Sequence, residues 1–327
     1  MNEKKKTYKM KKPAQQAAKR QKTERKTVYS RLERIPEGNA DSRIMPGCLV
    51  LEGGAFRGVY TSGVLDVLMQ NGINLDTTIG VSAGALNALG YVSGQIGRSA
   101  RIILRYRHDP RYVGLGPVLN RKDRGVIGFD FMLDQMNRIE PLNVERLMDP
   151  GRRLIAVATA ITTGWPVYFE RRQDVQAFYK AVQASASMPY VSSPVTVQGI
   201  RCLDGGCSVK IPFEWALEHG YKKVVVVRTR DRSYRPQRHD LSRAAGSVYG
   251  DYPEFAAALA NMNESYIREL EILDRLESEG RIFQIVPSLP IQIGRLESDM
   301  EKLGDVYWQG VHDAKENLER LKDYLKA

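Results

Sequence analysis

Runs of β-branched and apolar residues alternate along this chain with segments whose apolar residues follow helical spacing. We expect buried strands at residues 48–51, 75–79, 152–159 and 222–228. Helical spacing is found at residues 59–68, 85–92, 175–184 and 212–219. The first two strands each run through a turn into a helix, and this order predicts neighbouring parallel strands.

Turn residues predict two antiparallel hairpins in the middle of the chain. Residues 164–170 are expected to pair with the strand at 152–159. Residues 194–197 and 200–203 flank Gln198-Gly199, a dipeptide typical of a tight turn.

Three further regions have weaker patterns. Residues 97–107 are basic and are expected to be partly helical. Residues 108–140 are rich in Gly, Pro and aromatic side chains, which predicts an irregular cover that gates access to a functional site. Residues 229–252 are polar, and we expect a surface loop there.

The C-terminal part is predicted to be mainly helical. Residues 255–276 carry an apolar stripe, and residues 282–286 have the character of a strand. Apolar residues then recur with heptad-like spacing from Leu296 to Leu325. We expect a long helix packed on the body of the protein, with a dimer seam as the alternative.

Composition narrows the class of protein. The 327 residues are 43% hydrophobic and 27% charged, as in soluble globular proteins. No apolar run approaches the ~18 residues of a membrane-spanning helix, and no apolar segment follows the basic N-terminus as it would in a secretory signal. Cys48, Cys202 and Cys207 lack CxxC spacing and are expected to be buried thiols. We therefore predict a cytoplasmic protein.

Nearly all of the net charge of +11 belongs to the N-terminus. Residues 1–35 contain nine lysines and four arginines against three glutamates, a net charge of +10. With so little apolar content we expect this tail to be disordered. Its electrostatic attraction to anionic lipid or to nucleic acid is one interpretation, and a merely solvated extension is the other. No nucleic-acid motif or interleaved aromatic residue accompanies the basic residues, so no specific nucleic-acid partner is expected.

A glycine-rich loop follows the first strand. Gly53, Gly54, Ala55, Arg57 and Gly58 lead from that strand into a helix, and backbone N–H groups in such a loop stabilise negative charge. The Lys-Ser/Thr of a phosphate-binding P-loop is missing after Gly58, and the dinucleotide spacing GxGxxG is broken. The remaining interpretation is an oxyanion hole.

The second strand runs into Gly80-Val81-Ser82-Ala83-Gly84. A serine between two glycines at a strand-to-helix turn is typical of a nucleophile elbow, in which Ser82 is exposed and glycine prevents clashes on both sides. The alternative is an ordinary helix cap, because serine is a preferred N-cap residue.

Asp204-Gly205-Gly206 ends the strand at 200–203. An acidic residue at a strand end projects into a site at the sheet edge, whereas an ordinary Asp-Gly turn is the alternative. An aspartate with an ordinary pKa of ~3.9 is a poor base at neutral pH, so we expect burial to raise the pKa of Asp204.

These three motifs, in this order and each at a strand end, resemble the patatin-like phospholipase family over about residues 47–228. The resemblance implies a three-layer α/β sandwich with a mainly parallel central sheet and a helical C-terminal extension. The expected organisation is a tail at 1–35, a catalytic domain at 46–230 and a mainly helical extension at 231–327.

The resemblance also implies the chemistry. Ser82 would be the nucleophile and Asp204 its general base, with the loop at Gly53, Gly54 and Ala55 as oxyanion hole. The substrate would be an acyl ester of a lipid, and no metal ion or cofactor is expected. The family usually has a third glycine where this chain has Ala55, and a positive φ there would strain the loop.

Two other functions stay open on the residues alone. A conventional Ser-His-Asp triad would use a histidine downstream of Ser82, namely His219, His239 or His312. The non-enzymatic alternative is a degenerate hydrolase domain that docks to an anionic membrane or to nucleic acid through its basic tail. The physiological substrate and the oligomeric state cannot be predicted from these residues.

Overall fold

A mainly parallel sheet of eight strands forms the centre of the computed structural model, which describes residues 27–237 and 242–326. Seven strands lie in the order β10-β9-β2-β3-β5-β8-β7, and β6 pairs with β5. Their bounds are β2 Met45–Leu51, β3 Leu75–Val81, β5 Arg153–Ala160, β6 Pro166–Glu170, β7 Val195–Val197, β8 Ile200–Asp204, β9 Val224–Val227 and β10 Phe283–Ile285.

The strands from β10 to β5 are parallel, whereas β6 and β8 run antiparallel to β5. Both predicted hairpins are confirmed: β6 pairs with β5, and β7 pairs with β8 around Gln198-Gly199. A separate two-stranded sheet joins β1 (Gly38–Asn39) to β4 (Gln95–Ile96).

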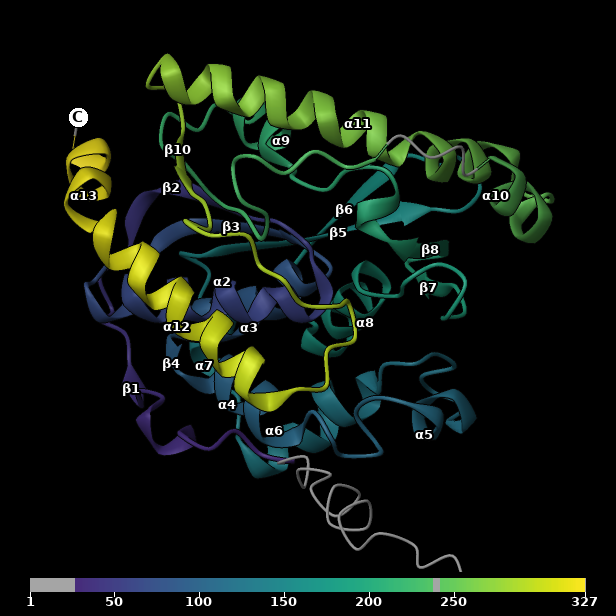
Figure 1. The fold of residues 1–327 in the computed structure, drawn as a ribbon, viewed down its shortest axis with the longest axis horizontal. Helices are drawn as coiled ribbons and strands as arrows, with labels where there is room; N and C mark the ends of the chain where they lie inside the picture. The colour runs from purple at the N-terminus through teal and green to yellow at the C-terminus, as the bar shows by residue number, and fades with distance from the viewer. Residues whose placement is uncertain (1–26, 238–241, 327) are drawn as a thin grey trace, which may run out of the picture.

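Helices cover both faces of the sheet and give three layers (Figure 1). The cluster on one face joins side chains of α2 (Gly58–Gln70), α3 (Ala83–Val92), α4 (Arg98–Tyr106), α8 (Val175–Ser185) and α12 (Met300–Glu316) to the sheet. The cluster on the other face joins α9 (Phe213–Glu218) and α11 (Pro253–Ser278) to it. This arrangement confirms the predicted α/β class and the three layers.

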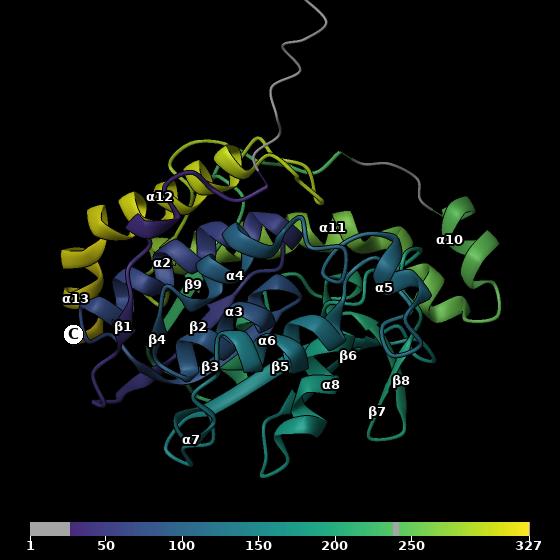
Figure 2. The same ribbon diagram turned by 90° about the horizontal axis from the view of Figure 1, so that it is seen from below.

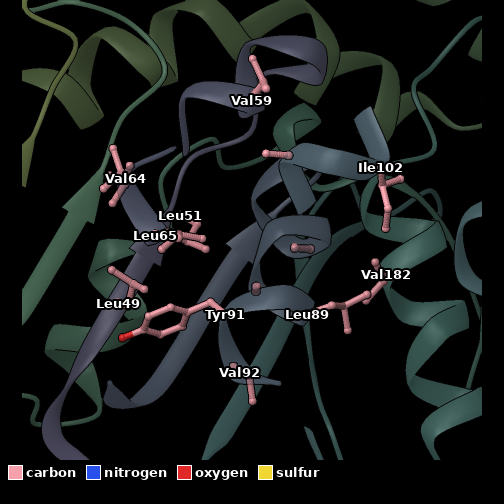
Figure 3. Packing of buried hydrophobic residues seen from close by; sticks show 14 of the residues in the cluster. Leu49, Leu51, Val59, Val64, Leu65, Leu89, Tyr91, Val92, Ile102 and Val182 are labelled. Atoms are coloured by element: carbon pink, nitrogen blue, oxygen red, sulfur yellow. The ribbon is translucent and has the colours of Figure 1, made fainter. Parts of the chain in front are cut away.

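Alternation along the central strands explains why both faces are buried. Leu49 and Leu51 of β2 point into the layer of α2 and α3, where they meet Leu65 and Tyr91 (Figure 3). Cys48 and Val50, between them in the sequence, point into the opposite layer against α9 and α11. A strand buried on both sides has a continuous apolar sequence, as residues 48–51 do.

The C-terminal helices pack on the body of the protein. The apolar residues with heptad-like spacing divide between α12 and α13 (Leu318–Lys326), so the predicted single helix is broken at Asn317. Met300, Leu303, Tyr307 and Ala314 are buried in the same chain, chiefly against α2. Their burial confirms intramolecular packing, and β10 of the same region extends the central sheet.

Two predictions of irregular structure were wrong in part. Residues 229–252 include α10 (Ser242–Tyr249), whose Ala245 is buried in a small cluster with Phe255 and Leu259. Residues 108–140 contain α5 (Leu115–Leu119), a π-helical turn (Phe131–Gln135) and α6 (Met136–Ile139). In both regions tertiary packing of a few apolar residues stabilises short helices that the local sequence does not predict.

The predicted disorder of residues 1–35 is wrong for residues 27–35, and residues 1–26 lie outside the described part of the chain. Tyr29 and Ile35 are buried. Trp308 of α12 donates a hydrogen bond to the Tyr29 hydroxyl at 3.0 Å, and Ser30 donates to Glu301 at 2.7 Å. The contacts of Tyr29 and Ser30 attach this end of the basic segment to α12.

A short 3₁₀ helix, Leu32–Arg34, follows Tyr29, and α7 (Val144–Leu147) precedes β5. None of the helices in the described part of the chain has both the length and the apolar character needed to cross a membrane.

Candidate active site

The sheet register brings Ser82 and Asp204 together, although they are 122 residues apart. In the parallel pair β3–β5, Val81 lies opposite Val157. In the antiparallel pair β5–β8, Asp204 lies opposite Ala158, the next residue of β5. Ser82 directly follows β3, and its Oγ donates a hydrogen bond to Asp204 Oδ2 at 2.7 Å.

Ser82 stands on a sharp turn between β3 and α3, with φ 55° and ψ −119°. A Cβ at Gly80 would lie 2.5 Å from the backbone carbon of Gly84, and a Cβ at Gly84 would lie 2.3 Å from the carbonyl oxygen of Leu51. Both flanking glycines are therefore needed for close backbone approach, as the elbow motif predicts. An ordinary N-cap is contradicted, because Ser82 makes no side-chain cap hydrogen bond.

The end of α8 supports this turn, a role that no sequence motif indicates. Ser185 is fully buried, and its Oγ accepts a hydrogen bond from the Ser82 N–H at 2.9 Å. The same hydroxyl donates to the carbonyl oxygen of Val157 at 2.6 Å. The backbone carbonyl oxygen of Ser187 accepts a hydrogen bond from the Asp204 N–H at 2.8 Å. Two serines of one helix end thus position both Ser82 and Asp204.

Asp204 is 7% exposed, and burial raises its pKa to about 6. Its hydrogen bonds from Ser82 and Gly206, and the charges of Lys210 and Arg295, act in the opposite direction. The Gly206 N–H donates to Oδ1 at 2.8 Å. Gly205 packs against β5, since a Cβ there would lie 2.2 Å from the Val157 carbonyl oxygen. The predicted upward shift is confirmed in direction.

The glycine-rich loop passes directly beside Ser82. A Cβ at Gly53 would lie 3.2 Å from the Ser82 Cβ, and one at Gly58 would lie 2.8 Å from the Ala83 Cβ. Within residues 27–237 and 242–326, the backbone N–H groups of Gly53, Gly54 and Ala55 donate no hydrogen bond. Within that part of the chain, these three N–H groups thus have no acceptor of their own.

Ala55 adopts φ 50°, the left-handed region that glycine tolerates and a Cβ does not favour. Strain in the loop is predicted from the sequence if φ of Ala55 is positive, and it is positive. The cost for an L-residue is about 1–2 kcal/mol. This strain lowers the folding stability. The Ala55 N–H also makes no hydrogen bond to any residue in the described part of the chain.

Arg57 follows in the same loop and is only 9% exposed. Burial is the main cause that lowers its pKa to about 10, and the nearby charge of Arg230 acts in the same direction. Its Nε has no hydrogen-bond partner among the described residues. Arg57 therefore places a buried positive charge in the loop, and the nearby charge of Glu52 acts to raise its pKa.

An apolar pocket opens beside Ser82. Its wall begins at Ala55 and Ser82 and continues through α3, α4 and the segment 112–133. The apolar side chains that line it are Phe56, Leu86, Leu89, Ile102, Ile103, Tyr112, Ile127, Phe129, Met132, Leu133, Met188 and Leu296. The segment 108–140 thus covers the site, as predicted, and a hydrocarbon chain is the group that such a wall accommodates.

The described histidines do not contact Ser82 or Asp204. His219 caps α9 and stacks on Trp215 with 3.9 Å between ring centroids. The His312 side chain is 65% exposed on α12. His108 contacts the carbonyl oxygen of Ser298 at 2.8 Å. His239 lies outside the described residues.

Comparison with known proteins agrees with these motifs. A family model described as patatin-like phospholipase matches residues 49–217, which is more than half of the chain. The chain belongs to the patatin-like phospholipase family. A second model, "Domain of unknown function (DUF6363)", matches residues 252–326 of this patatin-like protein.

Two curated proteins are similar to this patatin-like chain. An uncharacterized protein, YjjU of Escherichia coli (strain K12), is 29% identical over 80% of this chain and 74% of its own length. "Probable lipid hydrolase 463L" of Invertebrate iridescent virus 6 is 26% identical over 72% of this chain and 88% of its own length. Among solved structures, VipD from Legionella pneumophila covers 84% of this chain and 67% of its own, with 12% identity and a TM-score of 0.44.

In this patatin-like fold, the C-terminal helix α11 supports the glycine-rich loop from behind. Glu52, the residue before Gly53, is buried and accepts hydrogen bonds from the Tyr266 hydroxyl of α11 and from the Thr229 N–H. Thr229 Oγ1 donates to the Gly53 carbonyl oxygen at 2.8 Å. The segment matched as a domain of unknown function therefore helps to position the loop beside Ser82.

The same helix reaches the segment after Asp204. Glu269 of α11 accepts from the backbone N–H groups of Lys210 and Ile211 at 3.2 and 3.0 Å. Burial raises the pKa of Glu269 to about 8. Burial also lowers the pKa of Lys210, whose Nζ donates to the Gly206 carbonyl oxygen at 3.4 Å. None of these supporting residues has a motif by which sequence reasoning could identify it.

Replacing Ala55 by glycine should stabilise the protein. Glycine removes the left-handed strain, so we expect the free energy of unfolding to rise by up to ~1 kcal/mol in urea titrations. Ala88→Gly, at a buried position inside α3, is the control and should be destabilising. If Ala55→Gly is as destabilising as the control, Ala55 is not strained.

Replacing Tyr266 by phenylalanine should weaken the support of the loop. The Glu52 carboxylate loses a buried donor, which costs about 1–3 kcal/mol, and kcat should fall more than KM rises for a short soluble ester. Tyr252→Phe is the matched control, because Arg201 bonds the Tyr252 hydroxyl at an exposed site. Equal kinetics in the two variants would show that the Glu52 contact does not position the loop.

Proposed function

We propose that this chain is a serine hydrolase that cleaves acyl esters of lipids through an acyl-enzyme. Membership of the patatin-like phospholipase family and similarity to a probable lipid hydrolase support the general activity. The observation that carries the proposal is the 2.7 Å hydrogen bond from Ser82 Oγ to Asp204 Oδ2, at the wall of an apolar pocket.

In the proposed acylation step, Asp204 takes the hydroxyl proton as Ser82 Oγ attacks the ester carbonyl carbon. The carbonyl oxygen becomes negative and accepts hydrogen bonds from the N–H groups of Gly53, Gly54 and Ala55. The tetrahedral intermediate then expels the alcohol, which receives the proton from Asp204. The Ser82 acyl ester remains.

In deacylation, water replaces Ser82 as the nucleophile, and Ser82 becomes the leaving group. Asp204 takes a proton from water, whose oxygen attacks the carbonyl carbon of the acyl-enzyme. The bond to Ser82 Oγ breaks, Ser82 recovers its proton from Asp204, and the fatty acid leaves. No metal ion or cofactor is needed for either step, and the histidines have no role in them.

The acyl chain is proposed to occupy the apolar pocket between α3, α4 and residues 112–133. Its wall contains side chains suited to a hydrocarbon and few polar groups. The alcohol part of the ester would then lie toward Arg57 and Arg295. The charge of Arg295 is close enough to lower the pKa of Arg57. The prediction that residues 1–35 contact an anionic membrane remains a separate proposal.

A fluorophosphonate probe tests the nucleophile directly. We expect wild-type protein to be labelled at Ser82 and to hydrolyse short p-nitrophenyl esters, and Ser82→Ala to do neither. Ser185→Ala is a control for a buried serine that should weaken labelling without being its target. A folded wild-type protein that is not labelled would favour the non-enzymatic alternative.

The pH dependence tests Asp204 as the base. Because it acts as a carboxylate and burial raises its pKa to about 6, kcat/KM should fall as the pH decreases through about 6. Asp204→Asn should lose on the order of 10²–10⁴ in rate. Replacing His108, His219, His239 and His312 together should preserve activity, and a large loss in one single histidine variant would contradict the dyad.

The folding stability should change with pH in the direction opposite to kcat/KM and rise as the pH decreases through about 6. The folded pKa of Asp204 lies above its unfolded value of 3.8, so the ionised carboxylate lowers stability between these values and above them. Asp204→Asn should therefore melt at a higher temperature than wild type at pH 8. This difference should disappear below about pH 4.

A further inference from the structure

The most exposed leucines at one end of the molecule lie on the short helix α5. Leu115 and Leu119 are 79% and 83% exposed, and Val118 is also exposed. Tyr190 and Val191, in the segment between α8 and β7, are exposed as well. We call residues 115–119 and 190–191 the apolar rim.

The two parts of the apolar rim are joined through backbone contacts. The Gly114 N–H donates to the Val126 carbonyl oxygen at 3.0 Å, and the Val126 N–H donates to the Val191 carbonyl oxygen at 3.1 Å. Figures 1 and 2 both place α5 at the end of the molecule where β7 and β8 lie. Residue 126 therefore links the two parts of the apolar rim, which lie next to each other in the fold.

The apolar rim continues into the pocket wall. Ile127, next to Val126, lines the pocket and forms a β-bridge with Val113, two residues before Leu115. Met188, two residues before Tyr190, lines it too. A hydrocarbon chain that entered the pocket from this side would pass the rim on its way to Ser82.

Positive charge borders the apolar rim. Arg121 and Arg124 are exposed, and neither forms an ion pair or a side-chain hydrogen bond with any residue in the described part of the chain. Lys122 is paired with Asp130 at 2.7 Å, and Asp123 is buried. The surface thus combines solvent-exposed leucines with two uncompensated arginines.

This combination fits an anionic lipid surface. Exposed leucines bury apolar area among acyl chains, and arginines at the edge meet the phosphates of the head groups. Because the apolar rim is continuous with the apolar pocket beside Ser82, a lipid surface bound at the rim would lie next to that pocket.

We propose that the apolar rim with Arg121 and Arg124 docks the protein on an anionic membrane surface, with Leu115 and Leu119 inserted among the acyl chains. This docking proposal rests on the proposed function, because docking would bring the pocket beside Ser82 to the lipid ester that the protein is proposed to cleave. It differs from electrostatic attraction by residues 1–35, which involves no insertion at α5.

Fluorescence from a single introduced cysteine tests insertion in the full chain. Cys48, Cys202 and Cys207 are buried, so an environment-sensitive label attaches selectively to Leu119→Cys. Ser82→Ala in the same protein prevents lipid hydrolysis. Leu289→Cys, 67% exposed beside Gln309 of α12, is the matched control.

With vesicles of phosphatidylcholine and phosphatidylglycerol, we expect a blue shift at position 119 and none at position 289. Arg121→Glu with Arg124→Glu should weaken vesicle binding on the order of tenfold per reversed charge. Vesicle binding without a shift at position 119, equal shifts at both positions, or no vesicle binding would each overturn the proposal.

Two further experiments distinguish membrane docking from a dimer contact and from the proposed hydrolysis. If the protein self-associates without lipid and Leu119→Ser abolishes this in sedimentation velocity, the rim is a dimer contact and the proposal is wrong. Leu115→Ser with Leu119→Ser should hydrolyse a soluble ester like wild type but lose activity on vesicles. If wild type hydrolyses neither substrate while position 119 still inserts, the proposed function fails and the docking surface stands.

Discussion

The register of β5 is the constraint on which the candidate site depends. One strand holds β3 in parallel and β8 in antiparallel register, so the residues that follow Val81 and end β8 meet at Val157 and Ala158. A shift of either register by one residue would turn one partner to the opposite face of the sheet. The Ser82–Asp204 hydrogen bond is therefore a consequence of strand pairing across the centre of the protein, and it needs no mobile loop.

Placing a carboxylate at this position involves a compromise between solvation and basicity. For the proposed role of Asp204 as a base, a fully solvated carboxylate would be ionised but too weakly basic, whereas full burial without partners would keep it protonated. The Ser82 hydroxyl, the Gly206 N–H and the positive charges of Lys210 and Arg295 offset part of the burial. The resulting pKa of about 6 leaves the group mostly ionised at neutral pH and still raises its affinity for a proton.

The sequence predicts the parts of this protein that depend on local chemistry. The central strands, both hairpins and the elbow at Ser82 follow from apolar runs, turn residues and glycine spacing. Residues that act through long-range contacts could not be found in this way: Ser185 looks like any serine at a helix end, and Tyr266 looks like one residue of an apolar stripe. The attachment of Tyr29 to α12 was missed because one aromatic side chain does not change the composition of a basic segment.

Strain in the site and the presence of the C-terminal helices are connected. Both Ser82 and Ala55 adopt positive φ without being glycine, and such a conformation costs an L-residue about 1–2 kcal/mol. These conformations persist only if neighbouring contacts over-determine them. Ser185 holds the first, and the contact between Glu52 and Tyr266 of α11 braces the loop that contains the second. A patatin-like core without α11 would leave the buried Glu52 carboxylate without the Tyr266 donor. The helical region thus contacts the residue from which the loop with Ala55 begins.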